Sequence, residues 1–206
     1  MDYYTLKTEA QTEFTEKKSR FIGCARPVST QREAKDFIER ISKEHWDARH
    51  NVFAYRLREG GARYSDGGEP AGTAGLPVLS VLEKSGITDG CVVVTRYFGG
   101  VLLGASGLIR AYSHAASLAV GAAGVAHMRL CAECTLTCDY GDYGRASAVL
   151  PEKSAVVDDV IYADVVSIKF HIPIDLADDI TRALADATNG RIIPAVTGKG
   201  YYVVTS

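Results

Sequence analysis

Polar side chains that could do chemistry gather in two glycine-rich segments, 65–75 and 99–107, on either side of one apolar segment. The first segment carries Asp66 and Glu69 and follows His50 along the chain. A histidine and two carboxylates could act as a general acid and base or as metal ligands. The chain has no HExxH or HxH pattern and no nucleophile elbow. We expect the two carboxylates to cap the turn and the next helix or to pair with an arginine, and we keep catalysis by the trio as an alternative.

The second segment, 99–107, joins a β-branched apolar run to a predicted helix and could bind an anion. Gly99 and Gly104 have the GxxxxG spacing of a phosphate-binding loop, but alanine and serine follow where a Walker A loop has lysine. Free N–H groups at a helix N-terminus still attract phosphate or carboxylate. Arg96 and Arg110 could add bidentate contacts. The alternative is that these glycines only allow tight packing of the helix against the strand.

Five cysteines are an odd number, which argues against a secreted disulfide framework. Three of them, Cys131, Cys134 and Cys138, lie in a predicted strand. Alternation along a strand puts Cys134 and Cys138 on one face and Cys131 on the other, and no second CxxC completes a tetrahedral site. We therefore expect buried thiols, with no metal and no cofactor.

Composition favours a soluble globular protein of one or two domains: the 206 residues are 47% apolar and 23% charged. No apolar run is long enough to span a bilayer, and the first residues do not have the pattern of a signal peptide, so we expect a cytoplasmic protein without a membrane partner. Residues 1–129 carry 17 basic and 14 acidic side chains, and residues 130–206 carry 6 and 11. This balance is compatible with a local anionic ligand and excludes a strongly basic, general nucleic-acid binder.

Hydrophobic periodicity and helix-end signals place the elements of the first part of the chain. Thr30 and Glu33 form a capping box, and Pro77 suits the first turn of a helix that stops at Gly86. The predicted strands are 12–28, 49–58 and 90–98, and the predicted helices are 31–44, 77–86 and 106–123. The strand at 90–98 is apolar throughout, which predicts a central strand covered on both faces.

A second pattern starts after residues 121–124, which are the best candidate for a linker. We place the domain boundary between residues 126 and 127. The predicted elements after it are strand 129–139, helix 141–150 stopped by Pro151, strands 154–161 and 164–173, a helix capped by Asp175, and one or two strands in 191–205. The order βαββαβ is that of a ferredoxin-like domain.

Four segments in the first part resemble, in order, the signature of the IMPACT/YigZ family. They are 47–50 (DARH), 65–75 (SDGGEPAGTAG), 94–100 (VTRYFGG) and 103–112 (LGASGLIRAY), and 18–21 (KSRF) is similar to the family's first-strand motif. One position departs from the pattern, because Gly67 stands where the family usually has a second aspartate. That departure weakens any mechanism that needs two adjacent carboxylates, including a metal site.

The resemblance implies an α+β protein with two α/β-sandwich domains. Residues 1–126 would form a βαβ domain of the kind found in ribosomal proteins and in the tip domain of elongation factor G. Residues 127–206 would form a ferredoxin-like βαββαβ domain, as in the final domain of that factor. By analogy, the pairing implies contact with the ribosome or RNA, and eukaryotic relatives regulate translation under stress through protein partners.

The leading hypothesis is a non-enzymatic binding protein linked to the regulation of translation. Its partner would be RNA, the ribosome, another phosphate-bearing molecule or a translation-related protein, bound across the two glycine segments. The residues expected to contact it are Arg49, Ser65, Asp66, Glu69, Thr73, Arg96, Gly99, Gly100, Gly104, Ser106, Gly107 and Arg110. One alternative is a hydrolase-type enzyme that uses His50, Asp66 and Glu69. The other is a protein-docking module that exposes Tyr97, Phe98 and Tyr112.

Overall fold

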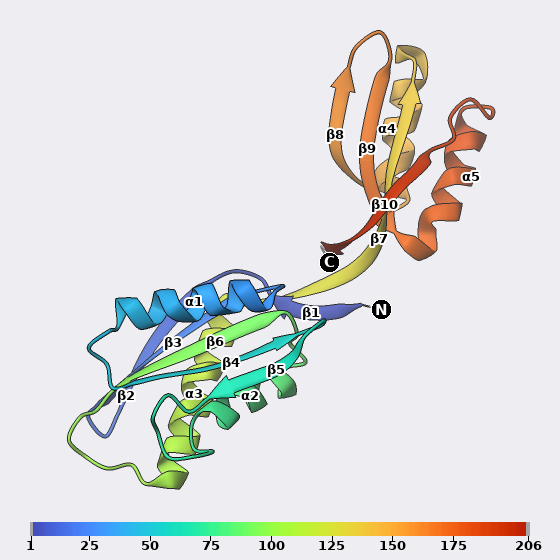
Figure 1. Ribbon diagram of the computed structural model, residues 1–206. Helices are drawn as coiled ribbons and strands as arrows, with labels where there is room; N and C mark the ends of the chain where they lie inside the picture. Colours follow the sequence, from blue (N-terminus) through green and yellow to red (C-terminus); the bar gives the residue numbers. More distant parts are fainter. Residues whose placement is uncertain (1, 205–206) are drawn as a thin grey trace. The chain divides into compact units, whose positions relative to one another are not determined.

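The computed structural model describes residues 2–204, which divide into two compact units (Figure 1). The first unit is Tyr3–His127, and the second contains the chain from Met128 onward together with Asp2. Each unit has its own buried apolar core. The division falls inside one continuous strand, β7 (Val125–Cys138). The linker expected at 121–124 is wrong, because residues 121–123 are the last turn of a helix and Gly124 is its C-cap.

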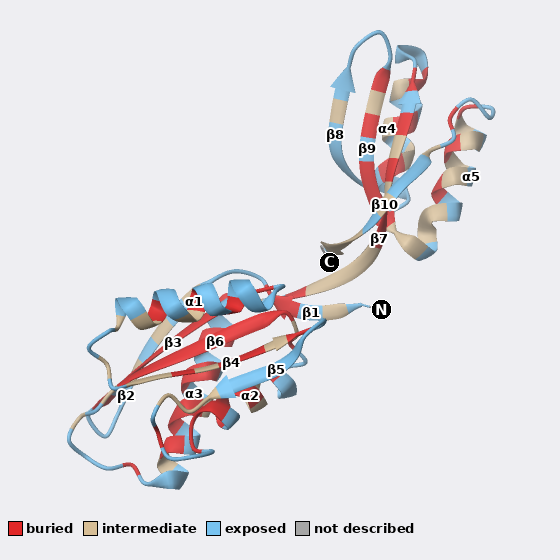
Figure 2. Ribbon diagram, viewed as in Figure 1, coloured by how far each residue is buried: buried red, intermediate tan, exposed pale blue. Residues whose placement is uncertain are grey.

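The first unit has a five-stranded sheet in the order β2-β3-β6-β4-β5, in which neighbouring strands are antiparallel. Its elements are β1 (Tyr3–Leu6), β2 (Ala10–Glu16), β3 (Ser19–Pro27), α1 (Gln31–Glu44), β4 (His50–Leu57), β5 (Gly61–Ser65), α2 (Gly75–Lys84), β6 (Gly90–Tyr97) and α3 (Ala105–Ala123). Figure 2 shows β6 buried along its length, as its apolar sequence predicts. Val93 packs with α1 on one face, whereas Val92 and Val94 pack with α2 and α3 on the other.

The strands of this unit differ from the prediction in two respects. The stretch 12–28 is a hairpin of β2 and β3, joined by a two-residue turn at Lys17 and Lys18. Their φ angles of 44° and 65° lie in the left-handed region, where hairpin turns favour asparagine and glycine. Sequence rules for hairpin turns therefore do not predict a turn at these two lysines. Residues 3–6 and 61–65 lie outside the predicted strands, and they form β1 and the edge strand β5.

Local signals fix the helix starts more closely. Thr30 caps α1 by accepting a hydrogen bond from the Glu33 N–H, and the Glu33 carboxylate accepts one from the Ser29 N–H. The predicted capping at this end is confirmed. The second helix begins at Gly75, two residues before Pro77, and the proline still lies in the first turn, where its missing N–H costs no hydrogen bond.

The second unit has the predicted βαββαβ order, and its sheet runs β10-β7-β9-β8 with antiparallel neighbours. Its elements after β7 are α4 (Tyr140–Glu152), β8 (Val156–Tyr162), β9 (Val166–Pro173), a 3-10 turn (Ile174–Leu176), α5 (Ala177–Ala187) and β10 (Ala195–Val203). Both helices pack on one face of the sheet, where Leu150 and Ile180 meet Leu136 and Phe170. The chain is thus an α+β protein with two units of helices packed on antiparallel sheets.

Two helix ends in the second unit correct the prediction. Asp175 does not cap α5. It lies in the 3-10 turn and accepts two hydrogen bonds from Arg129, while α5 begins without a side-chain cap. Pro151 does not stop α4 but lies in its last turn.

The cysteine side chains are buried, and none forms a disulfide. Cys134 and Cys138 pack into the core of the second unit, whereas Cys131 lies outside that core. Burial raises the pKa of Cys24 to about 11. Within residues 2–204, no three His, Cys, Asp or Glu side chains gather as metal ligands. No helix in the same range is long and apolar enough to cross a membrane.

Candidate functional site

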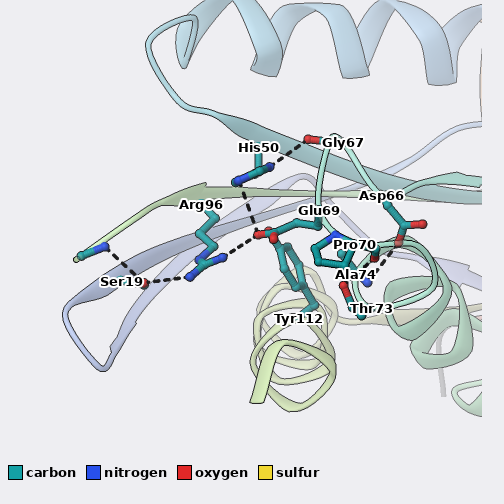
Figure 3. A network of polar contacts seen from close by, with 11 residues as sticks. Ser19, His50, Asp66, Gly67, Glu69, Pro70, Thr73, Ala74, Arg96 and Tyr112 are labelled. Carbon is teal, nitrogen blue, oxygen red and sulfur yellow. Dashed lines mark hydrogen bonds and ion pairs between the residues drawn. The ribbon is translucent and has the colours of Figure 1, made fainter. Parts of the chain in front are cut away.

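A buried carboxylate, that of Glu69, lies at the centre of the site (Figure 3). Arg96 Nη1 and the Tyr112 hydroxyl each donate a hydrogen bond of 2.7 Å to Glu69 Oε1. His50 Nε2 lies 3.9 Å from the same oxygen. These groups come from the first glycine segment, the end of β6, α3 and the start of β4. The contacts around Glu69 therefore join one loop to three separate elements.

Arg96 is held on its other side by Ser19, whose hydroxyl is fully buried. Arg96 Nη2 and the Gly99 N–H each donate to Ser19 Oγ at 3.2 Å. A Cβ atom at Gly99 would lie 2.0 Å from the carbonyl carbon of Lys18. Glycine is therefore required here because the second glycine segment presses against the β2–β3 turn.

Arg96 was expected to contact an anionic ligand, and in the structure its guanidinium is already engaged by Glu69 and Ser19. The residue is 5% exposed, and its charge is balanced by Glu69. Its Nε atom is buried and has no hydrogen-bond partner among residues 2–204. In this structure Arg96 is a structural partner of the two glycine segments, not an exposed anion contact.

Asp66 shapes the first glycine segment. Its carboxylate accepts hydrogen bonds from the N–H groups of Gly72, Ala74 and Gly75 at 2.8–3.0 Å, at the start of α2. Figure 3 shows the bond from Ala74. Burial alone would raise the pKa of Asp66, but these three N–H donors outweigh it and hold the pKa below its ordinary value. Asp66 therefore organises the loop, as the capping interpretation expects.

The two hydroxyl residues of the same segment also bond within it. The Thr73 hydroxyl donates to the Pro70 carbonyl at 2.7 Å, and Ser65 Oγ accepts from the Gly67 N–H at 3.2 Å. Both were predicted to contact a ligand. In the structure their polar atoms are engaged by the loop itself.

The alternative catalytic trio is only partly assembled. His50 Nδ1 lies 3.1 Å from the Gly67 carbonyl oxygen. A carbonyl oxygen can only accept a hydrogen bond, so we assign the proton to Nδ1. The other ring nitrogen, Nε2, faces Glu69. Asp66 is turned to the start of α2 and does not join this pair. A Cβ atom at Gly67 would lie 2.4 Å from the Asn51 carbonyl oxygen, so a second aspartate does not fit there without movement.

A pocket of about 420 Å³ opens beside the network, and we call it the loop pocket. Its lining residues come from the start of β4 and the residue before it, from the first glycine segment, from the end of β6, and from the chain between Phe98 and the first turn of α3. They are Arg49, His50, Gly68, Glu69, Pro70, Arg96, Phe98, Leu102, Leu103, Gly104, Ala105 and Leu108. Phe98 and Leu102 are 46% and 82% exposed. Arg49 is exposed and makes no hydrogen bond or ion pair within residues 2–204. The pocket therefore combines apolar surface with one free cation.

The start of α3 forms one wall of the loop pocket. Its N-cap is Gly104, with φ 75°, and no side chain caps the helix. The first N–H groups of a helix have no partner within the helix, and they carry the positive end of the helix dipole. Gly104 and the first residue of α3 line the pocket, whereas Ser106, Gly107 and Gly100 do not.

Arg110 lies elsewhere. It lines a second depression of about 370 Å³, which we call the hairpin hollow and which is formed by Phe14, Glu16, Lys17, Leu103, Gly107, Arg110, Ala111 and His114. Leu103 lines both depressions. The three arginines predicted to share one site are thus separated: Arg49 lies at the loop pocket, Arg96 is buried, and Arg110 lies at the hairpin hollow.

Sequence reasoning missed the roles of Ser19 and Tyr112. Tyr112 was a candidate for an exposed docking patch, but it is fully buried and its hydroxyl binds Glu69. Tyr97 is half-buried and donates to Asp47, which leaves Phe98 as the exposed aromatic residue of the three. The position of Tyr112 in the apolar stripe of α3 could have indicated a buried polar contact, because a buried tyrosine hydroxyl needs a hydrogen-bond partner.

Comparisons with known proteins agree with this architecture. Residues 17–120 match the model of the Impact N-terminal domain, and residues 136–191 match the Domain of unknown function (DUF1949). The IMPACT family member YvyE of Bacillus subtilis is 38% identical over 92% of this chain and 88% of its own length. The IMPACT family member YigZ of Escherichia coli is 34% identical over 85% of this chain and 88% of its own.

A solved structure, described as that of a hypothetical protein, aligns with a TM-score of 0.62 and 30% identity, covering 96% of this chain and 98% of the other. Both family models thus match in the expected order, and the relatives span nearly the whole chain. The chain belongs to the IMPACT family.

Proposed function

We propose that the first unit binds RNA through the loop pocket and that this binding serves the regulation of translation. The observation that carries the proposal is the combination found there: an uncapped helix start, the unpaired Arg49 and the exposed Phe98. A phosphate fits the first two features, because helix N-termini and arginine both bind phosphate oxygens. A base fits the third, because single-stranded nucleic acids stack their bases on exposed aromatic side chains.

The charge of the site favours a local contact over a broad basic surface. Arg96 adds no free charge, because Glu69 neutralises it. Arg49 is then the arginine of the loop pocket that can meet a phosphate directly. Binding that depends on few phosphate contacts is moderate in affinity and in sensitivity to salt. The link to translation rests on the family resemblance and on the ribosomal-protein-like architecture that it implies.

The test is the binding of a fluorescein-labelled single-stranded RNA to the full chain, measured by fluorescence anisotropy at low salt. Arg49→Ala should weaken binding about tenfold, roughly the loss of one charge-assisted contact. Arg32→Ala is the matched control, because Arg32 is an exposed arginine on α1, which packs on the other face of the sheet from α3. Equal affinity of the two variants, or no binding by the unmodified chain, would contradict the proposal.

The hydrolase alternative is less well supported. It needs three catalytic side chains, and of these the structure brings together only His50 and Glu69. The carboxylate of Glu69 already accepts from Arg96 and Tyr112, and it is 9% exposed as a residue. A general base must reach the proton that it removes, and here the neighbouring side chains enclose the carboxylate.

A further inference from the structure

The hairpin hollow, formed between β2 and α3, carries two cations that the fold does not use. Lys17 and Arg110 line it and make no hydrogen bond or ion pair within residues 2–204. Glu16 is the acidic residue of the lining, and His114 packs edge-on against Phe14. Both cations are exposed. Their charge is therefore available to a ligand.

The backbone conformation at Lys17 is unfavourable for lysine. Lys17 and Lys18 both have positive φ angles, in a two-residue hairpin turn that favours asparagine followed by glycine. Side chains with a Cβ atom are disfavoured in this region, so folding stability does not explain two lysines here. Strained residues of this kind cluster at functional sites. A role for their charge in binding does explain them.

The hairpin hollow and the loop pocket lie on two sides of the start of α3. Leu103 lines both, and Gly99 holds the β2–β3 turn against the second glycine segment. Figure 1 shows the turn and the chain before α3 at the same end of the first unit. A single strand of RNA whose phosphate lies at the loop pocket can thus continue over the start of α3 into the hairpin hollow.

We infer that the hairpin hollow is a second phosphate subsite, in which Lys17 and Arg110 bind the backbone of the same RNA strand that occupies the loop pocket. This inference rests on the proposed function. It adds that the ligand is a strand of several nucleotides and that Lys17 and Arg110 contribute to its affinity without contacting the loop pocket. It also implies that Glu16 weakens RNA binding, because its carboxylate repels a phosphate in the same hollow.

The experiment uses the full chain and a labelled single-stranded RNA of about 12 nucleotides, a length within the range bound by small single-strand domains. Arg110→Ala should weaken binding about three- to tenfold and reduce the magnitude of the slope of log K against log salt by about 0.7, the value for one phosphate contact to a single strand. The double substitution Lys17→Asn with Lys18→Gly should weaken binding similarly. It should leave the melting temperature unchanged or higher, because the new residues suit the turn.

Glu16→Gln should tighten binding and steepen the slope, a result that loss of folding cannot produce. Unchanged affinity in all three variants, with Arg49→Ala still weakened, would overturn the second subsite and leave the proposed function standing. No binding by the unmodified chain, or equal binding by Arg49→Ala, would overturn the proposed function itself.

Discussion

The ion pair between Glu69 and Arg96 should be the main link between the first glycine segment and β6, and Glu69→Gln tests this. The two side chains are 4% and 6% exposed, and the pair is 2.7 Å long. Glutamine keeps the size and one acceptor for Tyr112 but leaves the buried arginine without a counter-charge. Removal of one partner of a buried pair costs about 3–5 kcal/mol. We expect a value near 3 kcal/mol, because Ser19 still accepts from Arg96.

The measurement must report on the first unit alone, because the two units have separate cores. Native-state hydrogen exchange of β6 amides in the full chain does so, and a loss of about 3 kcal/mol corresponds to exchange about 100-fold faster. Amides of β9 are the internal control and should not change. Arg96→Met combined with Glu69→Gln should cost less than the sum of the two single changes by about 1–3 kcal/mol. Additive costs, or exchange of β6 within threefold of the unmodified chain, would refute the reasoning.

Two further predictions concern residues that hold the two glycine segments in place. The pKa of Asp66 is below its ordinary value in the folded chain. The stabilising effect of its carboxylate is therefore present above the ordinary aspartate pKa and is lost as pH falls below about 4. Asp66→Asn should make the exchange of β6 amides less dependent on pH in this acid range. Gly99→Ala should destabilise the first unit by about 1–3 kcal/mol, because its Cβ meets the Lys18 backbone. Gly121→Ala lies in open space on α3 and should stabilise the same unit by about 0.5–1 kcal/mol. Exchange of β6 amides that ranked the two variants the other way would contradict the packing argument.

Sequence patterns predicted features that depend on neighbouring residues. The cap at Thr30 involves residues within one turn, and the apolar run of β6 itself indicates burial on both faces. The βαββαβ order of the second unit follows from alternating periodicities, and it was confirmed. The β2–β3 turn was missed because lysines rarely adopt the left-handed conformation that it requires.

The candidate site depended on contacts between distant residues. Arg96 and Glu69 are 27 positions apart. The pairing of β4 with β6 places His50 opposite Arg96, and the first glycine segment returns to His50, whose Nδ1 contacts the Gly67 carbonyl. Ser19 and Tyr112 reach the same cluster from β3 and α3. Residue types alone indicated a concentration of glycine, carboxylate and arginine. They could not show that Glu69 would neutralise Arg96 and leave Arg49 as the free cation of the loop pocket.

The most direct test of RNA binding at the loop pocket is the salt dependence of the affinity for single-stranded RNA, compared between the unmodified chain and Arg49→Ala. Each phosphate contact to a single strand contributes about −0.7 to the slope of log K against log salt. We predict that the slope falls by about this amount in Arg49→Ala and stays unchanged in Arg32→Ala. The same slope in all three proteins would contradict a phosphate contact by Arg49.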